Sequence, residues 1–314
     1  MTKPEHAPKA ENEAGQPSPK RMMEALRKSG YLFEHEVAIA VERMGFYVER
    51  SHAYVDPDEG KSREVDIRAF KMVLNNKTFK FQVCVHMFIE CKDSDSPFVF
   101  LQTDKSEIDK EAVEGMEYLF PWQTNKSANA MMMRHYGLQH EHYYYKEPKK
   151  SVQFAKIVRK GSDWFALHEN VYDALILPQV KAVKEFMKGF GMVHSRPYEH
   201  ESIQLYFNAI VVRDHLFMLD LDRDDAEPQP AGRASFQRQI EMRSVKGKYL
   251  VDFVTQSYLE TYVQNEVLGF ANEIVRQFGE DPMRFRSHGA NEKRPNTDGP
   301  DPGENWRPGR ISLG

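Results

Sequence analysis

The spacing of apolar residues changes at Gly45, and the change predicts helices before it and strands after it. Between residues 21 and 44 the apolar positions follow helical spacing, with a break at Gly30, which favours two helices. After Gly45, apolar and polar residues alternate in runs that are separated by turn-forming residues, at 46–55, 64–74 and 79–91. This pattern predicts a meander of three strands behind a helix.

The second half of the chain predicts further strands and helices without an internal repeat. The runs follow the order helix, strand, strand, helix, at about 170–190, 205–221, 248–258 and 259–278. No composition shift separates a second domain, so we expect one α/β domain over 21–284. An insertion is expected around 105–165, where no regular pattern is clear.

Both ends of the chain lack a periodic pattern. Residues 1–20 and 285–314 are rich in proline, glycine and charged residues, and such segments bury too little apolar surface to fold. We therefore expect two disordered tails. Basic residues in the second tail are offset by acidic ones, which favours a solvated tail over a DNA-binding arm.

The composition indicates a folded protein without a global charge signature. Hydrophobic residues make up 40% and aromatic residues 12% of the 314 positions, which is enough for a substantial core. The formal net charge is −4. Any contact with nucleic acid must therefore come from a local basic patch.

Cysteine use and the lack of long apolar segments bear on the cell compartment. Cys84 and Cys91 fall on opposite faces of one predicted strand, so a disulfide between them is not expected. The start of the chain holds no apolar signal-peptide core, and no apolar run is long enough to cross a bilayer. We therefore expect a cytoplasmic protein with no membrane partner.

Ionisable residues interrupt the apolar pattern in the second and third predicted strands. Apolar residues fill odd positions there, so side-chain alternation places Asp66, Glu90 and Lys92 together on the opposite face. The odd-numbered apolar set comprises Val65, Ile67, Ala69, Val73, Phe81, Val83, Val85, Met87, Ile89 and Cys91. A short hairpin loop would place Asp66 opposite His86, roughly 13 Å from Glu90 at about 3.3 Å per residue. The charges therefore meet only if the hairpin around 71–78 contains a longer loop, a bulge or a strong twist.

Two carboxylates and an ammonium on one sheet face have two interpretations. One is an exposed face with an ion pair, which contributes little to stability. The other is an active site, because Mg²⁺ prefers carboxylate and main-chain oxygens, and a nearby lysine can orient a water and stabilise charge on a phosphate. We favour the active site because the charges end two strongly apolar strands, where their burial would otherwise only cost stability.

These residues resemble the PD-(D/E)xK nuclease superfamily, which has the restriction endonuclease-like fold. Its motif is an acidic residue in the second core strand and (D/E)-x-K in the third. Here "EVDIRAF" supplies Asp66, and "IECK" supplies Glu90 and Lys92. The segment "YLFEHEVAIAVERMGFYV" is similar to the entry helix of Mrr-type restriction enzymes and Holliday-junction resolvases, through Phe33, Glu34, Val37, Val41, Gly45 and Phe46.

The resemblance implies a fold, a reaction and a set of site residues. The fold would be a three-layer α/β core with a central mixed sheet flanked by helices. The reaction would be phosphodiester hydrolysis with Mg²⁺ or Mn²⁺. Asp66 and Glu90 would bind the metal together with the main-chain carbonyl of Cys91, and Lys92 would position the attacking water.

The resemblance also bears on the helix carboxylate, the substrate and the partners. Glu34 matches the motif, and Glu36 remains the alternative because both lie in the same helix. DNA is the implied substrate, although the residues themselves do not separate DNA from RNA. A homodimer, or a partner protein of defence or repair, fits by analogy alone. The alternative function is a catalytically inactive nucleic-acid-binding or protein-interaction module on the same fold.

Other residue groups have structural interpretations. Arg63 and Arg68 flank Asp66 and suit phosphate contacts as well as a plain surface role. The histidines and tyrosines at 135–145 could bind zinc or stack on bases, but no HExxH motif and no nearby cysteine supports zinc, and we favour a core-packing or loop role for them.

Overall fold

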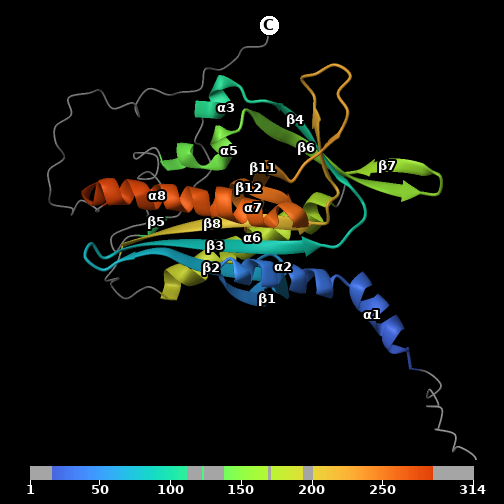
Figure 1. Ribbon diagram of the computed structural model, residues 1–314, viewed down its shortest axis with the longest axis horizontal. Helices are drawn as coiled ribbons and strands as arrows, with labels where there is room; N and C mark the ends of the chain where they lie inside the picture. The colour runs from blue at the N-terminus through green and yellow to red at the C-terminus, as the bar shows by residue number, and fades with distance from the viewer. Residues whose placement is uncertain (1–15, 112–121, 124–137, 169–170, 194–200, 286–314) are drawn as a thin grey trace, which may run out of the picture.

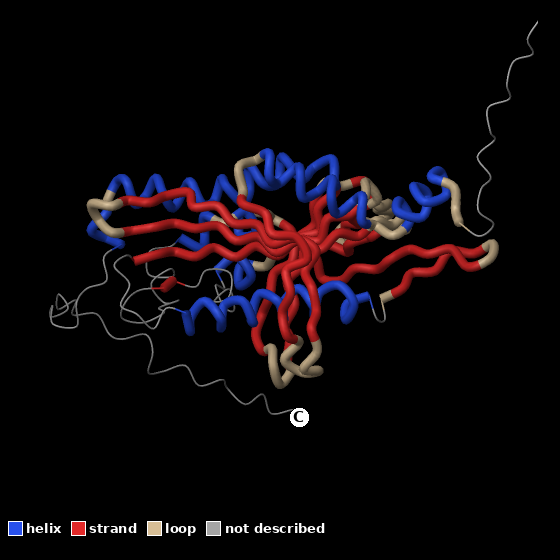
Figure 2. Tube along the Cα trace, turned by 90° about the horizontal axis from the view of Figure 1, so that it is seen from below, coloured by secondary structure: helices blue, strands red, loops and turns tan. Residues whose placement is uncertain are grey.

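The structure is a computed structural model that describes residues 16–111, 122–123, 138–168, 171–193 and 201–285. One mixed sheet of 12 strands runs through this part of the chain, with helices on both of its faces (Figures 1 and 2). The predicted three-layer α/β fold with a central mixed sheet is therefore confirmed. The strand order is β1 (Tyr47–Val55), β2 (Ser62–Asn76), β3 (Phe81–Lys92), β8 (Glu201–Val212), β12 (Lys246–Thr255), β11 (Arg233–Glu241), β6 (Lys149–Lys160), β4 (Phe98–Asp104), β9 (Leu216–Asp220) and β10 (Gln229–Pro230), with β5 (Trp122–Gln123) beside β8 and β7 (Asp163–Leu167) beside β6.

The first two helices follow the predicted pattern. α1 (Pro19–Lys28) and α2 (Tyr31–Arg43) are separated at Gly30, whose φ of +85° favours glycine. The other helical segments are α3 (Glu107–Glu111), α5 (Tyr143–Lys146), α6 (Val171–Val193), α7 (Leu259–Thr261), a π-helical turn (Tyr262–Val267) and α8 (Leu268–Glu280), with 3₁₀ turns at Leu138–Glu141, Gln256–Tyr258 and Pro282–Phe285. Across the described ranges, none of the helices combines the length and the apolar character that a membrane span requires.

Helices α2 and α8 cover one face of the sheet where β2, β3 and β8 lie. Phe33 of α2 is fully buried in the same cluster as Ile67 and Ile89. Phe278 of α8 stacks on Phe81 at the other end of β3, with ring centroids 4.4 Å apart. The odd-numbered face of β3 is therefore a core face, as predicted.

The opposite face of β3 is also buried, so the charged residues do not lie on an open sheet face. Phe186 of α6 lies against His86 and Phe88, with ring centroids 5.3 and 5.4 Å away. Along β3, the partly exposed residues on this face are Gln82 near the start of the strand and Glu90 and Lys92 at its end. The structure does not support the interpretation of these charges as a solvated sheet face.

A bulge in the β2–β3 hairpin brings Asp66 level with Glu90. The antiparallel register shifts after Met72, so that Ile67 pairs with Ile89. The next residues outward on the two strands are Asp66 and Glu90. The turn of the hairpin lies between Asn76 and Phe81, which accounts for most of the difference from the register with Asp66 opposite His86, and the bulge shifts the register by one residue.

Val65 departs from its predicted face. It packs with Tyr54 and Phe88 on the α6 side of the sheet, whereas Ile67 lies in the cluster under α2. Side chains two positions apart share a face in a regular strand. Strand β2 is therefore irregular at Asp66, which lies between these two residues.

The sequence pattern does not include β4, β6 and β11, which extend the sheet beyond β12. Within the expected insertion, residues 138–146 form a 3₁₀ turn and α5, and His142 is fully buried there, in agreement with core packing. Helix α1 begins at Pro19, inside the predicted first tail. The rest of the first tail up to residue 15 and residues 286–314 lie outside the described residues. Cys84 and Cys91 are free thiols, as expected.

The buried His86 predicts a loss of stability in mild acid. Its Nε2 lies 2.7 Å from Gln204 Oε1, and burial lowers its pKa from 6.5 to about 4. The unfolded chain therefore takes up this proton first, and the stability is lost as pH falls from about 6.5 towards 4. We expect His86 to account for about 2 kcal/mol of the drop in unfolding free energy between pH 7 and pH 5.

Urea unfolding of wild type and His86→Gln at pH 7 and pH 5 measures this effect. The variant should show a smaller drop than wild type, while the exposed His168→Gln should keep the full drop. Equal drops in wild type and His86→Gln would assign the acid sensitivity to other groups.

Candidate active site

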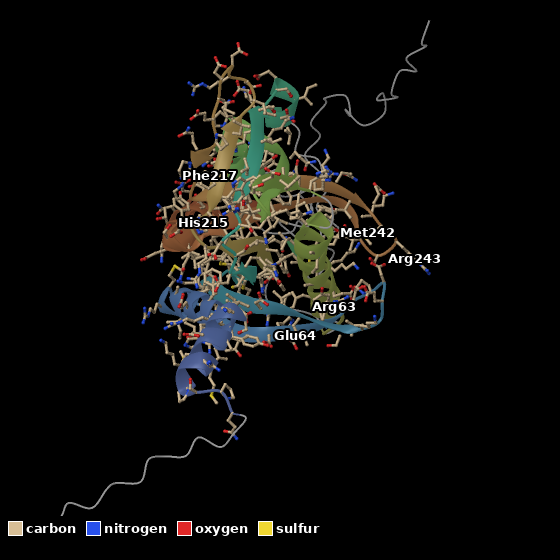
Figure 3. All side chains as sticks on the ribbon, turned by 90° about the vertical axis from the view of Figure 1, so that its right-hand side faces the viewer. Arg63, Glu64, His215, Phe217, Met242 and Arg243 are labelled. Carbon is tan, nitrogen blue, oxygen red and sulfur yellow. The ribbon has the colours of Figure 1, made fainter. Side chains whose placement is uncertain are left out.

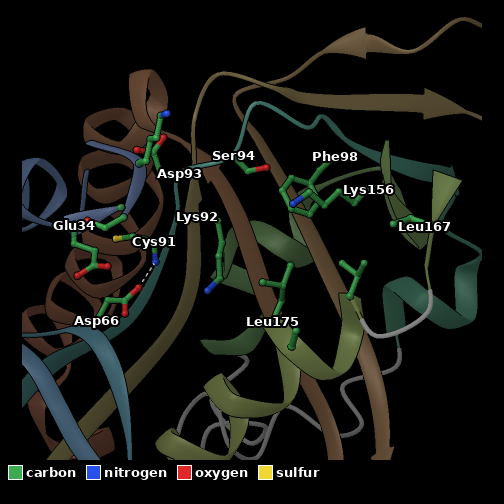
Figure 4. A pocket seen from close by; sticks show the side chains of 15 residues that line it. Glu34, Asp66, Cys91, Lys92, Asp93, Ser94, Phe98, Lys156, Leu167 and Leu175 are labelled. Atoms are coloured by element: carbon green, nitrogen blue, oxygen red, sulfur yellow. Dashed lines mark hydrogen bonds between the residues drawn. The ribbon is translucent and has the colours of Figure 1, made fainter. Parts of the chain in front are cut away.

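The candidate site lies where strands β2 and β3 part. Their pairing ends at Ile67 and Ile89, and the main-chain N–H of Cys91 instead donates to Asp66 Oδ2 at 2.7 Å (Figure 4). The Asp66 carboxylate thus accepts a hydrogen bond from the end of β3 where the pairing of β2 and β3 has stopped. Because the N–H and C=O of one strand residue point to the same neighbour, the Cys91 carbonyl also points towards the β2 side, where Asp66 lies.

An open cavity of about 680 Å³ lies at this end of the sheet. Figure 3 looks onto this end of the molecule, with Arg63 and Glu64 at the start of β2. The wall comes from the α1–α2 junction, the ends of β2 and β3, the β6–β7 hairpin and the start of α6. The lining residues are Lys28, Ser29, Gly30, Glu34, Asp66, Cys91, Lys92, Asp93, Ser94, Phe98, Lys156, Leu167, Val171, Ala174 and Leu175.

Glu34 reaches the cavity from the other layer of the fold. It lies in the first turn of α2, directly after the left-handed turn at Gly30. Its pKa is raised, first by burial and then by the negative charge of Asp66, while the ammonium of Lys92 opposes the shift. These mutual effects place Glu34, Asp66 and Lys92 at one site, as Figure 4 shows.

Glu36 points elsewhere. Its Oε2 accepts hydrogen bonds from Arg213 Nη1 at 3.3 Å and from Gln256 Nε2 at 3.0 Å. Glu36 does not line the cavity, whereas Glu34 does. Of the two helix carboxylates that the sequence left open, the structure places Glu34 with Asp66.

Glu90 and Lys92 lie two positions apart on β3 and form an ion pair. Lys92 Nζ lies 2.6 Å from Glu90 Oε1, and the two side chains are 32% and 15% exposed. Lys92 lines the cavity described above, while Glu90 lines a neighbouring cavity of about 710 Å³ that also contains Tyr54. Ala174 of α6 borders both cavities. Glu90 and Lys92 thus lie where the two cavities meet.

The negative charges of the site carboxylates are poorly compensated. Burial raises the pKa of Asp66 and of Glu90, and the charge of Asp66 raises the pKa of Glu90 further. Lys92 lowers both values but does not cancel the effect. Three carboxylates near a single ammonium therefore leave uncompensated negative charge in a partly desolvated place. A bound cation would relieve it.

The donor set suits a hard cation that retains water. Among the described residues, no group of three or more His, Cys, Asp or Glu side chains is arranged to hold a metal ion. Mg²⁺ is often bound by only one or two carboxylates and keeps several waters. The Asp66 and Glu90 carboxylates, with the Cys91 carbonyl, fit that mode of binding.

Several lining residues were not identified from the sequence. Asp93 follows Lys92 directly and forms a two-point ion pair with Arg213, with distances of 2.9 Å to Nε and 3.2 Å to Nη2. This pair fixes the end of β3 to the end of β8. Lys28 of α1 and Lys156 of β6 also line the cavity. The local sequence around these lysines does not indicate that they belong to the site, because only the tertiary fold brings them there.

Arg63 and Arg68 have structural partners. Arg68 Nη1 lies 2.7 Å from Glu49 Oε2, and its guanidinium lies 4.2 Å from the centroid of Phe186. Arg63 pairs with Glu59 at 2.9 Å. These contacts favour the plain structural role for both residues.

Comparisons with protein families, with curated proteins and with solved structures found no match for this chain. The resemblance to the PD-(D/E)xK nucleases therefore stands on the motif residues of this sequence.

Proposed function

We propose that the protein is a metal-dependent nuclease that hydrolyses phosphodiester bonds, with DNA as the expected substrate. The observation that carries the proposal is that Glu34, Asp66 and Lys92 line one open cavity. Glu90 forms an ion pair with Lys92 beside it. The family resemblance supports the proposal independently, because it rests on the order of motif residues along the chain.

Asp66, Glu90 and the Cys91 carbonyl would hold Mg²⁺ or Mn²⁺. When bound, such an ion supplies a Lewis acid for a phosphate oxygen and lowers the pKa of a coordinated water. Asp66 is held in place by the Cys91 N–H, so its second oxygen is free to serve as a ligand. Glu34 would hold a water or a further ion from the α2 side.

Lys92 would act on the attacking water and on the phosphate. Its ammonium has three donors, and one of them contacts Glu90 Oε1. The others can orient a water in the cavity and stabilise negative charge that develops on a phosphate oxygen. Lys92 is partly exposed towards the cavity, which such a role requires.

The rim of the cavity suits a polyanion. Lys28 and Lys156 line the same cavity as Glu34 and Asp66, and basic side chains contact phosphates without sequence selectivity. Carboxylates and lysines that line one cavity together match a phosphodiester that approaches a metal site.

The proposal is tested by incubating purified protein with supercoiled plasmid, single-stranded DNA and RNA, in Mg²⁺ or Mn²⁺ and in EDTA. We expect cleavage that requires the metal and that falls by about 10²–10³-fold in Lys92→Ala. Lys246→Ala is the matched control, because Lys246 forms an exposed ion pair with Glu241 at 2.9 Å and does not line the cavity.

Two outcomes would count against the proposal. Wild type that binds nucleic acid but cleaves neither DNA nor RNA would favour an inactive binding module on the same fold. Cleavage that persists in Lys92→Ala or in EDTA would place the activity outside this site.

A further inference from the structure

The hairpin formed by β6 and β7 projects from the sheet at the end where the cavity opens. β7 pairs only with β6 among the described strands, and Figure 1 shows the hairpin extending beyond the end of β3. The residues 159–166 at its tip are all exposed. This part of the hairpin contributes almost nothing to the core.

The two faces of the hairpin differ in their relation to the cavity. Cross-strand partners share a face, so one face carries the pairs Lys156 with Leu167, Val158 with Phe165, and Lys160 with Asp163. We call this the cavity face, because Lys156 and Leu167 line the cavity. The other face carries the pairs Ile157 with Ala166 and Arg159 with Trp164.

The cavity face combines basic and aromatic side chains. Phe165 is 45% exposed, and Lys160 Nζ lies 5.7 Å from the centroid of its ring. Lys156 lies closer to the cavity, with its Nζ 5.8 Å from the Phe98 ring. Asp163 is the one acidic residue of the hairpin between Lys149 and Leu167. The hairpin is thus a basic element on a chain whose net charge is −4.

This composition matches a nucleic-acid strand better than a protein or an apolar ligand. Lysines contact phosphates, and exposed aromatic rings stack on bases that are not paired. Lys156 and Lys160 are separated by about 13 Å along the strand at 3.3 Å per residue. That distance corresponds to about four stacked nucleotides at 3.4 Å each.

The geometry points to the cavity face of the β6–β7 hairpin as the surface that holds a single-stranded segment of the nucleic-acid substrate as it leaves the active site. Lys156 and Lys160 contact its phosphates, and Phe165 stacks on an unpaired base. This inference rests on the proposed nuclease function of the same site. It adds that the preferred substrate has an unpaired strand next to the bond that is cut.

The two faces of the hairpin provide an internal control. The test variant is Lys160→Gln/Phe165→Ala on the cavity face, and the control variant is Arg159→Gln/Trp164→Ala on the other face. Each variant removes one charge and one ring, and all four residues lie at the exposed tip. Unchanged thermal unfolding would show that both variants keep the fold.

Binding is measured by fluorescence anisotropy with a labelled single-stranded oligonucleotide and with the matching duplex, using full-length protein that carries Asp66→Asn to prevent cleavage. We expect the cavity-face variant to bind the single strand at least about 5-fold more weakly. The slope of log affinity against log salt should fall by about 0.7. The control variant should change the affinity less than about 2-fold, and binding of duplex should change less than binding of single strand.

The outcomes separate this inference from the proposed function. If wild type cleaves and binds single strands but the two variants behave alike, the inference about the hairpin is wrong and the nuclease proposal stands. A larger loss with the control variant would also overturn it. If wild type neither binds nor cleaves any nucleic acid, both proposals fail together.

Discussion

Asp66→Asn will stop cleavage and will also raise the stability of the protein. The carboxylate lies at the point where β2 and β3 part, and burial raises its pKa because the ionised form is poorly solvated. An asparagine oxygen can still accept the hydrogen bond from Cys91, but it carries no charge to hold a metal ion. We expect cleavage to fall by about 10³-fold or more. The unfolding free energy should rise by about 0.5–2 kcal/mol.

The comparison needs a carboxylate that is near the site but outside it. Glu36→Gln removes a charge from the same helix as Glu34, where its partners are Arg213 and Gln256. It should leave cleavage unchanged. Denaturant unfolding and a plasmid-nicking assay on both variants give the two readouts. An Asp66→Asn protein that cleaves as wild type does would remove Asp66 from the site, and a destabilised one would show that its charge supports the fold.

Arg233→Ala will cost the most stability of any single change considered. Arg233 is the centre of a buried polar cluster: its guanidinium forms ion pairs with Glu147 and Glu266 and lies 4.8 Å from the Tyr143 ring. Its side chain is 12% exposed. Removing one partner of a buried ion pair leaves the other charges without compensation. We expect the unfolding free energy to fall by about 3–5 kcal/mol.

The other residues of the cluster show why no other side chain could make all the contacts of Arg233. Asp252 accepts hydrogen bonds from Tyr143, from Tyr262 at 2.9 Å and from Ser235 at 2.5 Å. Asp252 and Glu266 both raise the pKa of Arg233, so its charge is held firmly. The cluster thus joins α5, β11, β12 and the π-helical turn through one guanidinium.

Arg276→Ala is the matched control for this prediction. Arg276 also has two acidic partners, Glu273 and Glu280, but it is 54% exposed on α8. Exposed pairs contribute about 0–1 kcal/mol, because water and salt screen them. The unfolding free energies of the two variants, measured by chemical denaturation under the same conditions, test this prediction. Similar losses in both would mean that the buried cluster carries no special weight.

Strong local periodicity explains which parts of the fold the sequence predicts well. The alternation along 64–74 and 79–91 reports the buried faces of β2 and β3 directly, and the break at Gly30 reports the turn between two helices. Strands β4, β6 and β11 lack such a signal because polar residues alternate irregularly along them. β4 pairs with β6 and β9, which are distant in sequence, and β11 pairs with β6 as well as with its hairpin partner β12. Their place in the sheet depends on long-range contacts.

The sequence predicts some residues of the candidate site and not others. Asp66, Glu90 and Lys92 follow from strand alternation once the position of the hairpin turn and a one-residue bulge set the register. The choice between Glu34 and Glu36 requires the rotation of α2 against the sheet, which the sequence does not specify. Lys156 belongs to a hairpin that lies far along the chain, so only the assembled fold could reveal its place on the cavity rim.

The position of β8 has a consequence for how the protein is made. β3 lies between β2 and β8, and β8 begins only at Glu201, long after β3 ends at Lys92. At about 5–20 residues per second, the ribosome needs on the order of 5–20 s to supply this second neighbour. During that interval the apolar edge of β3 has no partner strand, and unpaired edges of this kind invite association between nascent chains. The strand that bears Glu90 and Lys92 is therefore a segment of the newborn chain that a chaperone would protect from association.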